Sequence, residues 1–206
     1  MDPNIITQSL RDEIEAGVLQ PGTVLKQEEL AARFGVSRQP IRHALERLRE
    51  SGLLEKRPDR SLAVTGLRAN DVRELCQIRI SLEVTALQLS APNLSPSALR
   101  KARRINEDLF EEEDPEILAE LDRDFHTILY GASGNARLLA MIESLRGEAK
   151  RAYALQPKGS IPRTAFYGEH NQILDALVAG DVKAACDILG NHIGVTAGTL
   201  IPIDQP

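Results

Sequence analysis

The sequence predicts a mainly α-helical protein built from two domains, residues 1–66 and residues 67–206. Three observations support this prediction. Apolar residues recur with helical spacing in nine segments of the chain. One stretch, residues 53–66, instead contains two short runs typical of a β-hairpin. The charge also divides between the two parts, because the first carries 10 basic and 10 acidic side chains, whereas the second carries 15 and 20.

The first domain is predicted to contain three helices followed by a hairpin. The helices are expected at residues 5–16, at residues 27–34 and after Ser37, with a short turn at Gly35 between the second and the third. The runs LLEKRP and SLAVTG, on either side of the turn PDR, predict two short strands. Two helices joined by a short glycine-containing turn form a helix-turn-helix, and the hairpin that follows is its wing.

The third predicted helix lies in the basic part of the chain. Residues 33–60 contain eight basic and four acidic side chains, although the whole protein has a net charge of -5. Recognition helices read base edges with residues near their N-terminus, and the planar arginine fork suits guanine and phosphate. Arginines that are merely solvated are the alternative, but the order of the elements favours DNA binding. On this helix Arg38, Gln39 and Arg42 lie near the N-terminus, and Arg47 lies further along.

The second domain is predicted to be an antiparallel bundle of six helices. They are expected near residues 71–90, 96–110, 115–132, 135–154, 163–179 and 182–198. Ser95-Pro96 and Asp114-Pro115 provide helix starts, and Gly180-Asp181 provides a stop followed by a cap. Six helices with short connections pack side by side with alternating direction.

The composition limits the environment of the protein. No apolar run reaches about eighteen residues, the length that a membrane-spanning helix needs, and the N-terminus lacks the features of a signal peptide. Cys76 and Cys186 lie far apart in helical patterns, which favours free thiols over a disulfide. We therefore expect a cytoplasmic protein that does not contact membranes.

Three of the four histidines fall on apolar faces of different predicted helices in the second domain. His170 and His192 each continue an apolar series, and His126 lies four residues after Asp122, so that these two side chains project together. A carboxylate near a core is unfavourable unless it is paired. A divalent metal held by Asp122, His126, His170 and His192 would provide the pairing. Imidazole and carboxylate suit zinc, nickel, manganese or cobalt. A single core histidine is more often structural, so only the joint pattern favours a metal site.

Arg79 lies on the apolar face of the first helix of this domain. A buried ion pair, for example with Glu83, would explain its position. An anchor for a carboxylate ligand would explain it equally well, because arginine can grip a carboxylate through two hydrogen bonds. The pattern alone leaves both interpretations open.

The sequence resembles a known family in both parts. Residues 19–53 (LQPGTVLKQEELAARFGVSRQPIRHALERLRESGL) are similar to the winged-helix domain of GntR-family bacterial regulators in the PG turn, the spacing LA…GVSR…P.R.AL.RL and the final GL. The second domain resembles the FCD ligand-binding domain of the FadR subfamily. The residues that carry this second resemblance are Arg79 with Leu82-Glu83, Asp122 to His126, the ASGN run that ends at Asn135, Glu169-His170 and His192.

The resemblance implies a homodimer that binds a pseudo-palindromic operator on double-stranded DNA and responds to a small carboxylate effector. It implies that the operator is contacted by Ser37, Arg38, Gln39 and Arg42, with Arg47 near the DNA backbone. It implies that the metal, with zinc expected first, is held by the same aspartate and three histidines, and that Arg79 and Asn135 contact the acid. The wing of the family usually carries glycine at its tip, whereas PDRSLAV has none. Arg60 is the candidate there for a contact with phosphate.

The function expected from these observations is a metabolite-responsive transcriptional regulator, specifically a repressor, and not an enzyme. A direct metal sensor and a metalloenzyme that uses the same four residues are the alternatives. The enzyme is disfavoured because no general base with a recognisable spacing accompanies the ligands. It would also leave the helix-turn-helix unexplained.

Overall fold

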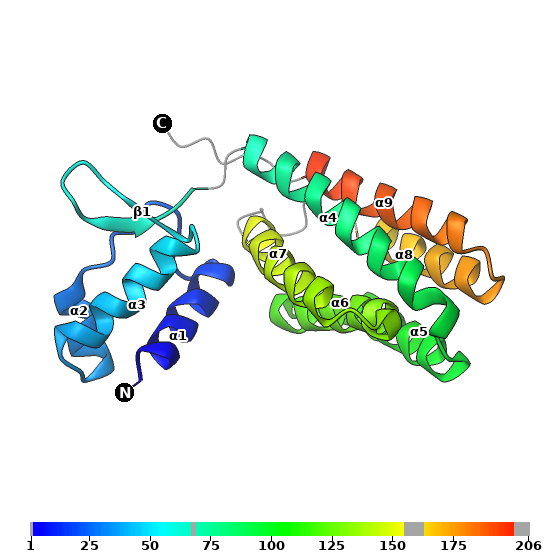
Figure 1. Ribbon diagram of the computed structural model, residues 1–206, viewed down its shortest axis with the longest axis horizontal. Helices are drawn as coiled ribbons and strands as arrows, with labels where there is room; N and C mark the ends of the chain where they lie inside the picture. Colours follow the sequence, from blue (N-terminus) through cyan, green and yellow to red (C-terminus); the bar gives the residue numbers. More distant parts are fainter. Residues whose placement is uncertain (1, 67–68, 155–162, 200–206) are drawn as a thin grey trace. The chain divides into compact units, whose positions relative to one another are not determined.

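The computed structural model describes residues 2–66, 69–154 and 163–199, which form two compact units; the first ends at Ala69 apart from the last turn of a later helix, residues 150–154, and the second contains the other described residues. Within these residues the chain forms nine α-helices and one two-stranded sheet (Figure 1). The predicted fold class is therefore confirmed. None of the helices in these ranges has both the length and the apolar composition that crossing a membrane requires.

The N-terminal unit contains three helices and the hairpin in the predicted order. The elements are α1 (Pro3–Glu15), α2 (Gln27–Phe34), α3 (Arg38–Glu50), β1 (Leu54–Lys56) and β2 (Leu62–Val64). Helix α1 starts two residues earlier than predicted, because the Asp2 carboxylate accepts a hydrogen bond from the Asn4 N–H and Pro3 suits the first helical position. Gly35 ends α2 in the left-handed conformation, with φ of 63°, and thereby makes the turn into α3. The core of the unit is entirely apolar, with Ile6, Leu10, Ile41, Leu45 and Leu48 among its most buried side chains.

The wing is an antiparallel hairpin in which Leu54 pairs with Val64. The Arg57 N–H donates to the Ser61 carbonyl at 2.9 Å, so that the loop between them contains three residues. Arg60, the last of the three, has φ of 68° and is the one non-glycine residue with a positive φ in the described chain. A three-residue hairpin loop places its last residue in the left-handed region, where glycine is usual. Arg60 thus holds the backbone conformation that a wing-tip glycine would supply.

The C-terminal unit is the predicted six-helix bundle. Its α-helices are α4 (Ala69–Ser90), α5 (Pro96–Glu111), α6 (Pro115–Tyr130), α7 (Ala136–Ala154), α8 (Arg163–Val178) and α9 (Val182–Thr199). Helix α6 ends two residues before the predicted position, because the chain tightens into a 3₁₀ turn at Gly131–Ser133. The Ser95 hydroxyl caps α5, and the Asp181 carboxylate accepts from the Ala184 N–H at the start of α9. The loop expected between α7 and α8 lies outside the described residues.

The core of the C-terminal unit differs from an ordinary apolar core. Phe125, Leu129, Ile173, Leu174 and Leu189 are fully buried. Polar and charged side chains are buried with them, and they are Arg79, Glu83, Ser90, Asn106, His126, His170 and His192. Cys76 and Cys186 are buried free thiols, as predicted. The buried polar residues mark the candidate site.

Candidate functional site

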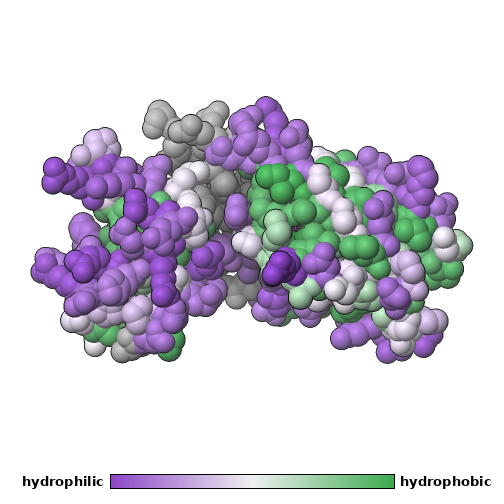
Figure 2. Space-filling view, viewed as in Figure 1, coloured by the Kyte–Doolittle hydropathy of each residue, from purple (hydrophilic) through white to green (hydrophobic). Residues whose placement is uncertain are grey.

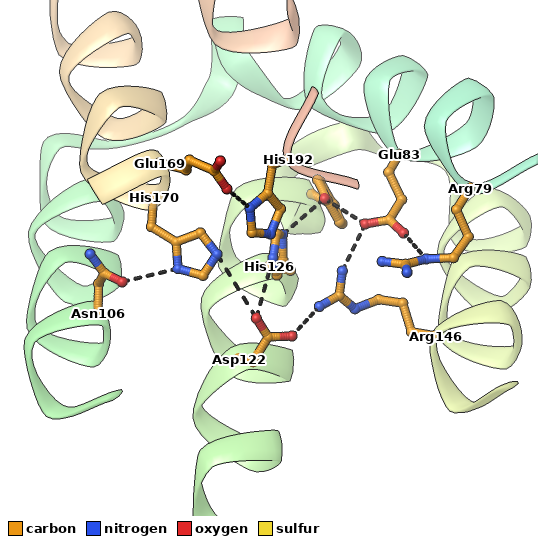
Figure 3. A network of polar contacts seen from close by, with 10 residues as sticks. Arg79, Glu83, Asn106, Asp122, His126, Arg146, Glu169, His170 and His192 are labelled. Carbon is orange, nitrogen blue, oxygen red and sulfur yellow. Dashed lines mark hydrogen bonds and ion pairs between the residues drawn. The ribbon is translucent and has the colours of Figure 1, made fainter. Parts of the chain in front are cut away.

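The bundle brings together three histidines from three helices (Figure 3). His126 lies on α6, His170 on α8 and His192 on α9, and all three side chains are buried. Each can offer one ligand atom, and these atoms lie within 4.8 Å of one another. The convergence that the helical spacing suggested is therefore present in the structure.

His170 is oriented by Asn106 on α5. The Asn106 amide nitrogen donates to the Tyr167 carbonyl at 3.2 Å, which leaves its oxygen to face His170 Nδ1 at 2.9 Å. An amide oxygen only accepts, so His170 Nδ1 carries the proton and Nε2 carries the lone pair. This Nε2 is buried and has no hydrogen-bond partner among the described residues. A buried imidazole nitrogen whose lone pair accepts no hydrogen bond is available to bind a metal ion.

The other two histidines have acceptors of the same kind behind them. His192 Nδ1 lies 2.6 Å from the Glu169 carboxylate. His126 Nδ1 lies 3.0 Å from the Tyr130 hydroxyl, which donates its own proton to Glu83 at 2.8 Å and therefore accepts from the histidine. Both rings thus keep a lone pair on Nε2. Outer partners of this type fix the ring orientation and the tautomer of metal-ligating histidines.

His126 and His170 are held in the neutral form. Burial, and after it the nearby Arg146 guanidinium, lower the pKa of His126 to about 4, although Asp122 acts in the opposite direction. Burial also places the pKa of His170 well below its usual range, with smaller contributions from His126 and His192. Neutral imidazoles near pH 7 are the form that binds divalent cations.

Asp122 supplies an oxygen next to two of these nitrogens. Its Oδ1 lies 3.6 Å from His126 Nε2 and 3.9 Å from His170 Nε2. These distances exceed a hydrogen bond, but a cation bound at about 2.1 Å to each atom could join ligands up to about 4.2 Å apart. The side chain is 41 % exposed, which leaves this corner of the site open to solvent. Burial raises the pKa of Asp122, but the Arg146 guanidinium, His126 and His170 together outweigh it and hold that pKa well below the usual range. The three histidines, with an Asp122 oxygen beside two of them, therefore offer atoms of the kind that divalent cations bind.

An arginine–glutamate network borders this cluster. Arg79 Nε lies 2.7 Å from Glu83, so the ion pair that the sequence left open is present. Arg146 on α7 joins the network by binding Glu83 at 2.8 Å and Asp122 at 2.5 Å. Burial raises the pKa of Glu83, but Arg146 and then Arg79 lower it to about 2. Glu83 is thus an ionised carboxylate inside the core.

Arg146 is the main residue that sequence reasoning missed. It lies four residues after the buried Ile142 and eight after the buried Leu138, so it continues an apolar helix face. The same kind of position, a charged residue on an apolar helix face, is what drew attention to Arg79 on α4. The structure also does not bring Asn135 to the cluster. Its side chain caps α7 by accepting from the Leu138 N–H, about 16 Å along the helix axis from Arg146.

The predicted DNA-contacting residues are all exposed on the N-terminal unit. Ser37 occupies the N-cap position of α3, but its hydroxyl makes no capping hydrogen bond. Arg38 pairs with Glu28 on α2 at 2.5 Å, and Arg47 donates to the Asn4 side chain on α1. Gln39 is an exposed neighbour of Arg38 on the same helix.

An open groove separates α3 from the wing. It is lined by Arg38, Arg42, Arg49, Lys56 and Arg60, together with Lys26 and three glutamates. The structure therefore brings Arg38, Arg42 and Arg60 to one groove, whereas Ser37, Gln39 and Arg47 lie outside it. Arg49 and Lys56 were not predicted, although Arg49 follows Arg42 by seven residues and so shares its helix face.

Both units match the models of known protein families. Residues 4–64 match the model of the bacterial regulatory proteins of the gntR family, and residues 74–195 match that of the FCD domain. The chain is 32 % identical to a probable D-xylose utilization operon transcriptional repressor of Paenarthrobacter nicotinovorans, over 88 % of this chain and 80 % of that protein. It is 28 % identical to the transcriptional repressor RspR of Escherichia coli K12, over 91 % and 84 %.

A solved structure agrees with this relationship. McbR/YncC of E. coli superposes with a TM-score of 0.79 and 25 % identity, over 96 % of each chain. The predicted resemblance to GntR regulators is confirmed in both units. The chain belongs to the GntR family of bacterial transcriptional regulators and carries an FCD domain.

Proposed function

We propose that this protein is a transcriptional repressor whose affinity for its DNA operator is controlled by a small carboxylic acid bound at a divalent metal. One observation carries the proposal. Three buried histidines converge inside a domain joined to a DNA-binding unit, and an Asp122 oxygen lies beside two of them. The regulators most similar in sequence include two that are described as repressors.

The DNA partner is double-stranded and is bound through the groove between α3 and the wing. Five arginine and lysine side chains, Arg38, Arg42, Arg49, Lys56 and Arg60, face this groove from the two elements. Neutralised phosphates supply most of the affinity in such an interface, and residues at the start of α3 supply the base contacts. Ser37 and Gln39, which flank Arg38 at the start of α3, would join these base contacts, and Arg47 would contact the DNA backbone.

The regulator is proposed to act as a homodimer on a pseudo-palindromic operator. Ile78 and Leu89 on α4 are 50 % and 44 % exposed, and their spacing of three helical turns puts them on one face. Figure 2 shows hydrophobic surface over α4. A contiguous exposed apolar face on a regulator of this kind suits a second copy of the chain.

The proposed ion is zinc, with nickel, manganese or cobalt as alternatives, because three imidazoles and one carboxylate suit all four. When bound, it supplies a positive centre with open positions for an oxygen ligand. Arg146 places a guanidinium group beside that centre, and Arg79 lies behind it on Glu83 (Figure 3). Together they would favour an acid over a neutral ligand of the same size. The acid acts as a switch only if it binds one dimer arrangement more tightly than another.

An operator-binding assay across small acids tests the switch. Zinc-loaded protein is titrated onto its operator in gel-shift experiments with a panel of mono- and dicarboxylates. At least one acid is expected to weaken binding between 5- and 150-fold, as typical coupling energies predict. If metal is bound and no acid changes the affinity, the acid-controlled switch is wrong. Loss of operator binding on chelation, with no effect of any acid, would instead identify a direct metal sensor.

A histidine variant tests the metal centre. His170→Ala is expected to reduce bound metal below one tenth of the wild-type content, measured by elemental analysis after dialysis. His43→Ala provides a matched control, because His43 is exposed on α3 in the other unit. Its metal content should equal that of the wild type. Equal metal content in both variants would show that the proposed ligand set is wrong.

A further inference from the structure

The two oxygens of Asp122 have different partners. Oδ1 faces His126 Nε2 at 3.6 Å and His170 Nε2 at 3.9 Å. Oδ2 accepts a hydrogen bond from Arg146 Nη2 at 2.5 Å (Figure 3). The carboxylate is therefore divided between the metal cluster and a guanidinium group.

Arg146 is itself held in place from the opposite side. Its Nη1 donates to Glu83 Oε2 at 2.8 Å, while Glu83 is bound by Arg79 at 2.7 Å and by the Tyr130 hydroxyl at 2.8 Å. The guanidinium is planar, so fixing Nη1 on Glu83 also fixes the direction of Nη2 toward Asp122. The Arg146 side chain is 11 % exposed and Glu83 is fully buried. Burial makes these charge-assisted bonds difficult to exchange for water.

We infer that Arg146 is a positioning residue that restricts Asp122 to a single oxygen ligand and so keeps coordination positions open for the acid. The inference rests on the metal site of the proposed function. Three nitrogens and one oxygen provide four protein ligands, which leave one or two positions on an ion that accepts five or six. If Oδ2 were released, Asp122 could bind through both oxygens, as carboxylates do at many metal sites, and would fill one of these positions.

Two other roles for Arg146 make different predictions. If Arg146 only balances buried charge, the Arg146→Lys variant would have the same metal coordination as the wild type. If Arg146 only contacts the acid, its replacement would leave the metal coordination unchanged in the absence of acid. The positioning role requires both nitrogens of the fork, because one binds Glu83 and the other binds Asp122.

Cobalt-loaded full-length protein allows these roles to be separated. Visible absorption of bound Co²⁺ changes with the number of ligands, and malonate serves as a probe acid that offers two oxygens. The variants are Arg146→Lys, which keeps the charge, and Arg146→Gln, which keeps only hydrogen bonding. Arg137→Gln, at an exposed position on the same helix, is the matched control. Each spectrum is recorded before and during a malonate titration, after cobalt content and helical circular dichroism have been measured.

Both Arg146 variants are expected to retain cobalt, to show an altered spectrum before malonate is added, and to bind malonate at least tenfold more weakly. The Arg137 variant should match the wild type in all three measurements. An unaltered malonate-free spectrum in Arg146→Lys would overturn the inference, as would loss of cobalt from both variants. Failure of the wild type to bind cobalt, zinc, nickel or manganese would instead reject the proposed metal site. If Arg146→Gln does not fold, the spectrum of Arg146→Lys still decides the question.

Discussion

The two units of this regulator differ in whether charged side chains enter the core. In the N-terminal unit the core is apolar, and the arginines proposed to bind DNA are exposed around it. In the C-terminal unit a guanidinium group, a carboxylate and three imidazoles are buried in the core. Among the described residues every buried polar or charged side chain belongs to this second unit. Figure 2 shows the matching difference on the visible face, which is mostly hydrophilic over the N-terminal unit and partly hydrophobic over α4.

Because of this difference, substitutions at the two functional surfaces are expected to affect stability differently. Exposed arginines can be exchanged without changing the packing beneath them, because surface substitutions usually alter stability by less than about 0.5 kcal/mol. Buried charges stabilise a core only while every partner is present, and an unpaired buried ion is strongly destabilising. Changes at the sensor site are therefore expected to alter folding and ligand binding together, whereas changes at the DNA surface should alter binding alone.

The largest expected effect comes from removing the central buried carboxylate. Glu83→Gln leaves Arg79 and Arg146 without the ion pairs at 2.7 and 2.8 Å, and only Asp122 then remains to balance Arg146. The free energy of unfolding is expected to fall by about 3 to 5 kcal/mol, which urea denaturation would measure. Glu143→Gln, exposed on α7, is the control and should change stability by less than about 0.5 kcal/mol. A similar small change in both variants would contradict the dependence of this core on its ion pairs.

Acid should destabilise the metal-free protein through the histidine cluster. The pKa of His126 falls from 6.5 to about 4 on folding, so below pH 6.5 the unfolded chain binds a proton that the folded chain does not. The stability is complete above pH 6.5 and is lost as the pH falls toward 4. With about 1.4 kcal/mol for each pH unit, the loss from His126 alone approaches about 3 kcal/mol.

Urea denaturation of chelator-treated protein between pH 7.5 and pH 4.5 measures this loss. His126→Gln is expected to reduce the dependence without abolishing it, because His170, whose pKa burial also lowers, is still present. A midpoint that does not move between pH 7 and pH 5 would show that protonation of the buried cluster is not linked to unfolding.

Most of the fold was predictable because short sequence patterns determine where the helices begin and end. Proline and cap residues fixed the starts of α5, α6 and α9, and Gly35 fixed the end of α2. The errors concern ends where tertiary structure or a 3₁₀ turn intervened, as at Gly131–Ser133 after α6. The hairpin was also predicted from its strand pattern. The left-handed conformation of Arg60 was not, because arginine has no intrinsic preference for it.

The site was predictable only in part because helical phase shows which face a residue occupies, not what lies opposite. Asp122 and the three histidines were found because their residue types suggested a metal. Arg146 lies on a comparable apolar face, but its partners Glu83 and Asp122 come from two other helices. Asn135 was assigned to the acid by resemblance, whereas in the structure its side chain accepts a hydrogen bond from a backbone N–H at the start of α7.

At the DNA surface, Arg42→Ala should separate binding from stability. Arg42 is exposed on α3 and lines the basic groove, so its loss is expected to weaken operator binding by about 1 to 3 kcal/mol. The free energy of unfolding should change by less than about 0.5 kcal/mol. Arg104→Ala removes the same charge from an exposed position on α5 and serves as the control. Equal weakening by both variants in fluorescence anisotropy would attribute the effect to net charge and not to the groove.

The smallest effect is expected at the wing tip, where one substitution should change stability and DNA affinity in opposite directions. Arg60→Gly relieves a left-handed residue, which stabilises the hairpin by up to about 1 kcal/mol, partly offset by the greater freedom of glycine in the unfolded chain. The same change removes a cation from the groove, so operator affinity should fall, and the slope of log affinity against log salt should decrease by about 1. Stability and DNA affinity would then move in opposite directions. Arg60→Asn, which tolerates the left-handed conformation without the charge, should bind DNA like the glycine variant. If both variants bind as tightly as the wild type at every salt concentration, Arg60 retains its strained conformation for a reason other than phosphate contact.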